Sequence, residues 1–336
     1  MWIFIIGHDK VVVMFDLASI RTWTQYLDKL VLYVLNRRIP DSFKQNPAEM
    51  LDIEAVLAQT TVNLEKTAVS NLIAPGEHKV CLNTLCGELC CQVRVRLAVN
   101  PRAPLLLYHH GFAEVPYTST WQKLFPKNNP FPAHLVAVQA PYHTEMNTAV
   151  QSVFSSLQHI LQTFAGSIRI MQLLQAVFEE NEAAFTVASG LSWGGITSIL
   201  YGGVFNHVRA VVPLYASPNL AQLLWDNAET FGRDLPFSHE TLSHYLDFTP
   251  YYERLESQRV FAVLGSNDLF FRKDHHATVY ADEALVMTSS NHVGAVTQNR
   301  TLLRQNLHDA LDFAANNPLN PAVARTTSHE FSRQAA

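Results

Sequence analysis

The period of apolar and polar positions changes along the chain, and these changes divide it into elements. Helical spacing of apolar residues predicts one helix over 18–38, a second over 47–58 and a third that continues to about 72. The first 15 residues hold two short apolar runs separated by a polar break. We interpret them as a pair of short strands or a docked extension, because an export signal needs a basic start and a longer apolar run.

Past residue 75 the pattern becomes that of strands. Residues 78–85 and 88–99 read as two strands around Gly87, and the clean alternation at 92–97 predicts a hairpin with one solvated face. Short apolar strands are then predicted at 105–108, 134–138, 185–188, 208–214, 260–264 and 284–287. Helices are predicted at 147–180, with a break or kink at Gly166, at 193–201 and at 300–315. Buried strands alternating with helices predict an α/β fold with a doubly wound, mostly parallel sheet.

No composition break demands a second independent domain. We therefore expect residues 1–75 to form an N-terminal helical extension packed on a main domain of residues 76–336. Within the main domain, residues 218–256 read as helices joined by loops. Ligands of such sheets bind at the carboxyl ends of the strands, so the residues that follow each strand are the places to search for chemistry.

Composition limits the classes of function. The 336 residues are 48% hydrophobic and carry a net charge of −5, from 24 basic and 29 acidic residues, which excludes a disordered chain and makes nucleic acid an unlikely partner. No apolar run reaches the roughly 18 residues of a membrane span. No pair of histidines has the spacing of a zinc helix motif. The sequence implies no metal and no organic cofactor.

Four cysteines, Cys81, Cys86, Cys90 and Cys91, lie in one short stretch. They lack the C-x-x-C spacing of tight zinc sites, and on a strand Cys90 and Cys91 would point to opposite faces. We expect buried or half-buried thiols. This favours a reducing compartment, so a cytoplasmic, soluble protein is predicted.

The sharpest chemical signal is the run from Gly190 to Gly194, in which Ser192 is the middle residue of a G-x-S-x-G motif. The motif lies between a predicted strand and a predicted helix, the context that a nucleophile elbow requires. Such a turn is tight, so Ser192 must adopt a strained backbone and the residues two before and two after it must be small. The elbow would present the hydroxyl at the positive end of the following helix. The alternative is a glycine-rich helix start with a capping serine.

A second signal follows the strand at 105–108, where His109 and His110 precede Gly111 and Phe112. A developing oxyanion needs two N–H donors aimed at it. We assign one to the backbone N–H of Trp193 and the other to that of Phe112, with Ala113 as a close rival. Gly111 would let the backbone approach a substrate. His110 is expected to brace the loop rather than transfer protons, and His109 to be structural.

With the elbow and this loop in place, the sequence resembles the α/β-hydrolase superfamily over about residues 78–316. The resemblance implies serine esterases, lipases or peptidases and a chain order of serine, acid and histidine. The acid should follow a late strand, which favours Asp268, with Asp274 as the fallback. The histidine should follow the last strand, which leaves His292 as the base.

The other histidines do not meet this positional requirement. His275 and His276 come before the final strand, and His308 lies inside the closing helix. Members of the family often carry an insertion that caps the pocket, and 218–256 is the expected cap here.

Candidate substrate contacts are His110, Gly111, Tyr142 and His143, because 140–143 also follows a strand. Ordinary loop packing is an equal alternative for Tyr142 and His143, and Glu114 could be merely solvated. Aromatic side chains within 218–256 suggest an apolar acyl or aryl site, although they could equally pack this segment onto the core.

The resulting hypothesis is a serine hydrolase that cleaves a small ester-like substrate through Ser192, His292 and Asp268 and an acyl-enzyme. An acyltransferase, a thioesterase or a peptidase on the same triad stays open, as does a non-catalytic binding protein with this fold. The N-terminal extension could also serve contacts between copies of the chain, through an apolar face that includes Trp23 and Tyr26.

Overall fold

The structure is a computed structural model that describes residues 23–38 and 49–319. Its strands are β1 (Thr61–Val62), β2 (Gly76–Thr84), β3 (Gly87–Arg96), β4 (Leu105–His109), β5 (His134–Val138), β6 (Thr186–Leu191), β7 (Ala210–Leu214), β8 (Ala262–Gly265) and β9 (Leu285–Thr288). Its α-helices are α1 (Trp23–Arg38), α2 (Ile53–Ala58), α3 (Ser119–Leu124), α4 (Met146–Val153), α5 (Leu157–Glu180), α6 (Trp193–Phe205), α7 (Leu220–Thr230), α8 (His239–Leu246), α9 (Thr249–Glu253), α10 (Lys273–His276) and α11 (Ala295–Asn316).

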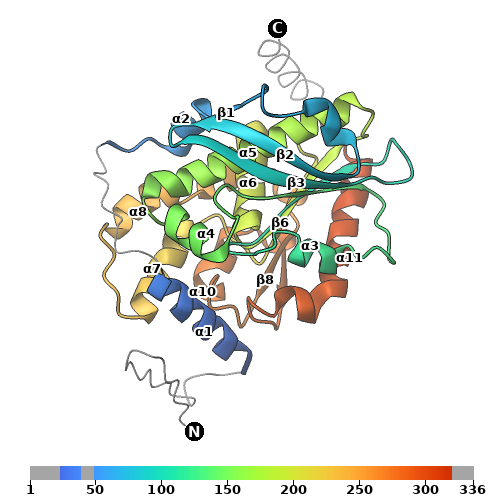
Figure 1. Cartoon of the computed structure of the whole chain (residues 1–336). Coiled ribbons are helices and arrows are strands. Elements are labelled where there is room, and N and C mark those ends of the chain that lie inside the picture. Colours follow the sequence, from blue (N-terminus) through green and yellow to red (C-terminus); the bar gives the residue numbers. More distant parts are fainter. Residues whose placement is uncertain (1–22, 39–48, 320–336) are drawn as a thin grey trace.

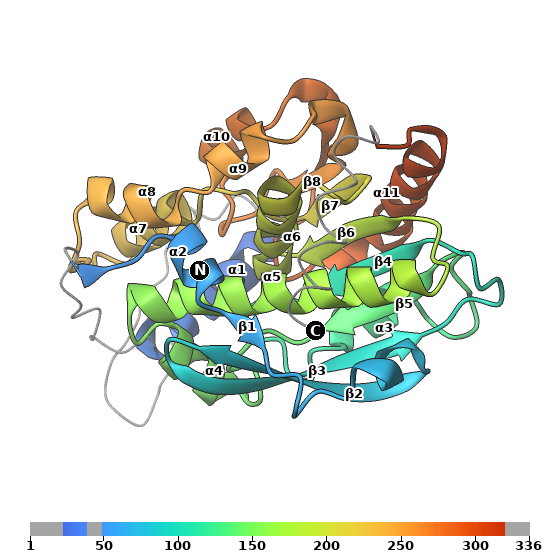
Figure 2. The same cartoon turned by 90° about the horizontal axis from the view of Figure 1, so that it is seen from above.

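In these ranges the strands form a single sheet in the order β1-β2-β3-β5-β4-β6-β7-β8-β9. The pairs from β5 to β9 are parallel, and β1, β2 and β3 pair antiparallel at one edge. Figure 2 shows the β2–β3 hairpin at one end of the molecule and β8 with α10 at the other. The predicted fold class, a mostly parallel α/β sheet, is therefore confirmed.

Helices cover both faces of the sheet because alternate strand residues point to opposite sides. In β4, Leu105 and Leu107 belong to the larger hydrophobic core, which includes α5 and α6, whereas Leu106 and Tyr108 belong to the core formed with α3 and α11. Figure 1 shows α3 and α11 together on one side of the sheet and α4, α5 and α6 on the other. The central strands are thus buried on both faces, which explains their continuously apolar sequences.

Three local predictions are corrected. Residues after 58 form β1 and a short 3-10 turn at Val69–Ile73 instead of a third helix. The predicted helix at 147–180 is two helices, and the break falls at Ser156, whose side chain caps α5 by accepting a hydrogen bond from the His159 N–H at 3.1 Å. Gly166 lies inside α5, where a Cβ would come within 2.8 Å of the Pro141 ring, so close packing rather than a bend calls for glycine.

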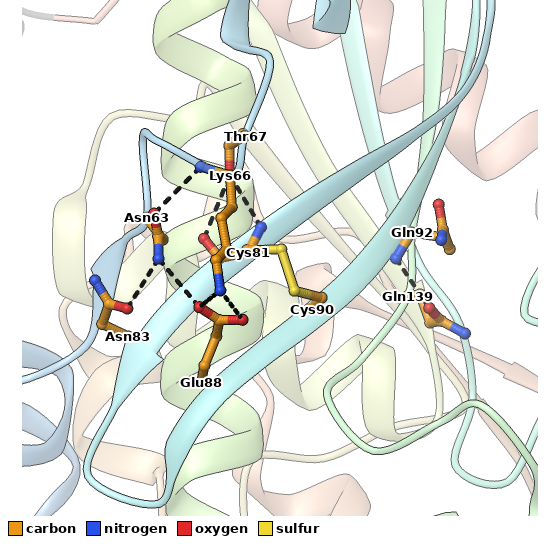
Figure 3. The surroundings of a disulfide bond; sticks show 9 residues. All are labelled: Asn63, Lys66, Thr67, Cys81, Asn83, Glu88, Cys90, Gln92 and Gln139. Atoms are coloured by element: carbon orange, nitrogen blue, oxygen red, sulfur yellow. Dashed lines mark hydrogen bonds and ion pairs between the residues drawn. A yellow bond between two sulfur atoms is a disulfide. The ribbon is translucent and has the colours of Figure 1, made fainter.

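The prediction of buried or half-buried thiols holds for only one of the four cysteines. Cys81 and Cys90 lie opposite each other on β2 and β3 and form a disulfide (Figure 3). Cys91 is a buried thiol as predicted, and Cys86 is an exposed one. The cysteines therefore no longer favour a reducing compartment, and the cytoplasmic location stays a prediction.

Some predictions concern regions that these observations do not decide. The pair of strands predicted near the N-terminus lies outside the described residues. The helix predicted over 47–58 is shorter than expected, because α2 begins only at Ile53, where the side chain of Asp52 caps it by accepting a hydrogen bond from the Ala55 N–H. Within 23–38 and 49–319, no helix is long and apolar enough to cross a membrane. The division into an extension, a main domain and a cap stays a prediction, as do contacts between copies of the chain.

Candidate active site

Ser192 lies at the sharp turn between β6 and α6. Its backbone has φ of 55° and ψ of −117°, a conformation that costs a non-glycine residue about 1–3 kcal/mol. A Cβ on Gly190 would lie 2.2 Å from the carbonyl group of Gly194, and a Cβ on Gly194 would lie 2.1 Å from the carbonyl oxygen of His109. The turn can therefore form only with glycine at both positions, which is the physical content of the motif.

The side chains of Ser192, His292 and Asp268 meet at the carboxyl ends of β6, β9 and β8. The distance from the Ser192 Oγ to the His292 Nε2 is 2.9 Å, and the His292 Nδ1 lies 2.7 Å from the Asp268 Oδ2. Asp268 follows β8 and His292 follows β9, and these two strands are adjacent and parallel. Asp274, the fallback acid, is exposed on α10.

The surroundings of Asp268 set the tautomer of His292. The second carboxylate oxygen of Asp268 accepts hydrogen bonds from the backbone N–H groups of Phe270 and Phe271, at 2.7 and 3.0 Å. Because the carboxylate can only accept, the His292 Nδ1–H donates to it, and the lone pair of Nε2 faces Ser192. The serine hydroxyl thus donates its hydrogen bond to the unprotonated Nε2 of His292.

Burial and charge act in opposite directions on His292. Burial lowers the pKa of the imidazole, but the attraction and hydrogen bond of Asp268, together with the charge of Asp28, raise this pKa above its ordinary value overall. The ring of Phe270 stacks on the imidazole with the centroids 4.3 Å apart. This aromatic contact holds the plane of the ring that must receive the serine proton.

The loop after β4 runs past the nucleophile. A Cβ on Gly111 would lie 3.8 Å from the Cβ of Ser192, and Ala113 has a positive φ of 56°. The carboxylate of Glu114 accepts from the N–H of Gly111 at 3.2 Å and from the N–H of Thr120 at 2.6 Å. Burial raises the pKa of this carboxyl. Glu114 therefore braces the loop and is not a solvated surface residue.

The histidines behind this loop are structural. The His110 Nε2 accepts a hydrogen bond from the Ala140 N–H at 2.9 Å, so its Nδ1–H donates to the carbonyl oxygen of Gly111 at 2.6 Å. Burial lowers the pKa of His109 to about 3 and that of His143 to about 4, and it also lowers that of His110. All three rings are neutral near pH 7 and can pack together without charge repulsion.

A cavity of about 560 Å³ opens at the nucleophile, and Ser192 and His292 lie in its wall. Most of the lining side chains are aliphatic or aromatic. They include Leu30, Val31, Leu32, Val34 and Leu35 from α1, Leu220, Leu223 and Leu224 from α7, and Phe112, Phe154, Trp193, Phe270 and Phe271 from the loops and helix starts around the serine. The cavity suits an apolar group attached to a carbonyl carbon.

The strand order and the connections now define the architecture. The sheet is parallel from β5 to β9 with antiparallel strands at one edge, the serine follows the central β6 on a tight turn, and the acid and histidine follow β8 and β9. The chain has the α/β-hydrolase fold.

No protein-family model matches the sequence, and no curated protein does. Solved structures with a similar course of the chain include a lipase, an esterase and a peptidase. A lipase in an open form has a TM-score of 0.49 at 13% identity over 72% of this chain and 100% of its own. A hyperthermophilic esterase from Pyrobaculum calidifontis has a TM-score of 0.42 at 15% identity over 91% of this chain and 98% of its own. An acylaminoacyl peptidase from Pyrococcus horikoshii has a TM-score of 0.48 at 13% identity over 70% of this chain and 41% of its own. At these identities the assignment of the fold rests on the strand order and connections of this chain.

Within this fold the predicted site residues fall into two groups. Ser192, His292, Gly111, Phe112 and Trp193 line the cavity, and Asp268 lies behind the histidine. The wall of this cavity does not include His110, Tyr142 or His143. Trp193 is the first residue of α6, where backbone N–H groups have no acceptor within the helix, as an oxyanion donor requires.

Sequence reasoning missed the contribution of α1. The sequence predicts only a packed extension for residues 1–75, yet α1 lines the cavity and brings the carboxylate of Asp28 to the backbone of the loop that carries His292. An aspartate in an amphipathic helix is ordinarily solvated, so its residue type gave no signal. Among the described residues no group of three or more His, Cys, Asp or Glu side chains could hold a metal ion.

Proposed function

We propose that the protein is a serine hydrolase that cleaves carboxylic esters through Ser192, His292 and Asp268. The observation that carries the proposal is the continuous hydrogen-bonded chain from the Ser192 Oγ through His292 to Asp268, at 2.9 and 2.7 Å, on an elbow whose strained backbone exposes the serine. A serine with a purely structural role would not need a backbone with positive φ. A purely structural Asp–His pair would not need a hydrogen bond from its imidazole to that serine.

In the proposed reaction Ser192 attacks the carbonyl carbon of the ester while His292 takes its proton. The negative charge that develops on the carbonyl oxygen is stabilised by the N–H groups of Trp193 and Phe112, aided by the positive end of α6. The imidazolium, held by Asp268, then protonates the departing alcohol as the acyl-enzyme forms. Water, deprotonated by His292, releases the acid and regenerates the serine.

The cavity supports an apolar acyl or aryl group in the substrate. Its wall is mostly aliphatic and aromatic, and its volume of about 560 Å³ exceeds what an acetyl group needs. An amide, a thioester or transfer to an alcohol would use the same chemistry, and product analysis with added alcohol or peptide distinguishes these reactions.

The proposal is tested with p-nitrophenyl esters and the Ser192→Ala variant. We expect the wild type to release p-nitrophenol and the variant to lose several orders of magnitude in kcat with its melting temperature retained. A Ser→Ala change at Ser289, an exposed serine on the loop before His292, serves as the matched control and should leave kcat unaltered. Equal turnover by wild type and Ser192→Ala would refute the assignment.

A further inference from the structure

Helix α1 carries a buried carboxylate that the triad does not account for. Asp28 is fully buried, whereas most described side chains of this helix are half-buried or exposed. A carboxylate removed from water is strongly destabilising unless hydrogen-bond donors compensate it. Its surroundings are therefore expected to contain several donors.

Four donors among the described residues surround Asp28, and none of these four belongs to its own helix. Its Oδ2 accepts from the backbone N–H groups of His292 at 2.9 Å and Leu269 at 3.1 Å. Its Oδ1 accepts from the N–H of Val293 at 2.9 Å and from the side-chain amide of Asn291 at 2.8 Å. Because all four partners are donors, the carboxylate is held in its ionised form.

These donors come from the two loops that carry the base and the acid. Leu269 directly follows Asp268, and the other three donors belong to residues 291–293, around the histidine itself. One rigid group on α1 thus fixes the separation of the two loops on which the 2.7 Å bond from His292 to Asp268 and the 2.9 Å bond to Ser192 depend. Small displacements of such groups are costly, since a shift of about 1 Å can reduce a rate about 100-fold.

We propose that Asp28 is a positioning residue of the active site, a carboxylate from the N-terminal helix that ties the Asp268 and His292 loops together and holds the imidazole in line with Ser192. The inference rests on the proposed function. It also makes α1 part of the catalytic unit, because Leu30, Val31 and Leu32, about one turn further on, line the cavity. Docking of α1 then completes the substrate pocket and aligns the base in a single step.

The charge of Asp28 affects the pKa of His292, and this effect distinguishes a positioning role from a role in packing alone. Asp268 and Asp28 are the two carboxylates that raise the pKa of His292, and burial raises the pKa of Asp28 itself. Other titratable groups near the two loops include Tyr215, whose ring lies 6.4 Å from that of His292, the neutral, buried His276, which interacts with Asp268, and Glu114, which lines the same cavity. Neutralising Asp28 removes one of two negative charges and should lower the pKa of His292.

The test uses Asp28→Asn and Asp28→Glu in the full chain, with a p-nitrophenyl ester as substrate. In Asp28→Asn the amide NH₂ faces two N–H donors, so we expect kcat per folded molecule to fall about 100-fold with little change in KM. The acidic limb of the kcat/KM profile should move to lower pH. Asp28→Glu keeps the charge but not the reach, so kcat should fall while the acidic limb stays in place.

The matched control is Asp226→Asn, which changes another buried aspartate, whose carboxylate contacts the side chains of His275 and Gln222 and not those of the triad. It should leave both kcat and the acidic limb unchanged. If Asp28→Asn and Asp28→Glu lower only the folded fraction, with wild-type kcat per folded molecule and an unmoved acidic limb, Asp28 is merely structural and the inference is wrong. A failure of the proposed function is seen in a different measurement, as ester turnover by Ser192→Ala that equals the turnover by the wild type.

Discussion

Replacement of Asp268 by asparagine isolates the contribution of the acid without changing its shape. The side chain is held by two backbone N–H groups, those of Phe270 and Phe271, which donate to its Oδ1 at 2.7 and 3.0 Å. An asparagine must keep its single carbonyl oxygen at that position, so its NH₂ group turns toward the His292 Nδ1. An NH₂ group can only donate, which forces the imidazole into the tautomer with its proton on Nε2.

That tautomer cannot accept the proton of Ser192, because Nε2 already carries one. The same substitution in a serine protease triad lowers kcat about 10⁴-fold, which corresponds to about 5.4 kcal/mol of transition-state stabilisation. We expect a loss of this size in kcat for Asp268→Asn on a p-nitrophenyl ester at pH 7.5. The melting temperature should change little, since the buried shape is preserved.

The control for this measurement is Asp274→Asn, which changes the exposed aspartate on the following helix α10. It should retain full activity. An Asp268→Asn enzyme within tenfold of the wild type would mean that Asp268 does not set the tautomer of His292, and the reasoning about the triad would be wrong.

Three further predictions follow from the site. In Gly194→Ala the added methyl group would lie 2.1 Å from a backbone carbonyl oxygen, so this variant should lose both activity and several degrees of melting temperature, as followed by circular dichroism. The raised pKa of His292 places the acidic limb of kcat/KM above pH 6.5, since the base must be neutral; a limb well below pH 6 would contradict this. Across p-nitrophenyl esters of increasing acyl length, kcat/KM should rise about fourfold per methylene, from about 0.8 kcal/mol each, until the cavity is full, and a flat series would argue against an apolar acyl site.

The central sheet could be predicted from the sequence because its strands are short, apolar and buried on both faces. The elbow could be predicted for a similar reason, since steric contacts across one tight turn dictate the residue types at Gly190 and Gly194. The order of these residues along the chain then predicts that Ser192, Asp268 and His292 form one site, and in the structure their side chains lie within hydrogen-bond distance. These features depend on local chemistry and on the rules of parallel sheets.

The errors have a different physical origin. The edge strand Thr61–Val62 exists only because β2 lies beside it, and the disulfide exists only because the register of the β2–β3 hairpin sets Cys81 opposite Cys90. The residues within either segment do not indicate which strand or cysteine will lie beside them. Asp28 is the extreme case, because its donors lie about 240 to 265 residues further along the chain.

The account depends most directly on Ser192 being an activated nucleophile. A fluorophosphonate probe, followed by mass spectrometry of the peptides, measures this without knowledge of the natural substrate. We predict a single phosphonylated peptide with the adduct on Ser192, formed by the wild type and greatly slowed in His292→Ala. Wild-type enzyme that stays unlabelled, or carries the adduct on another residue, would contradict the account.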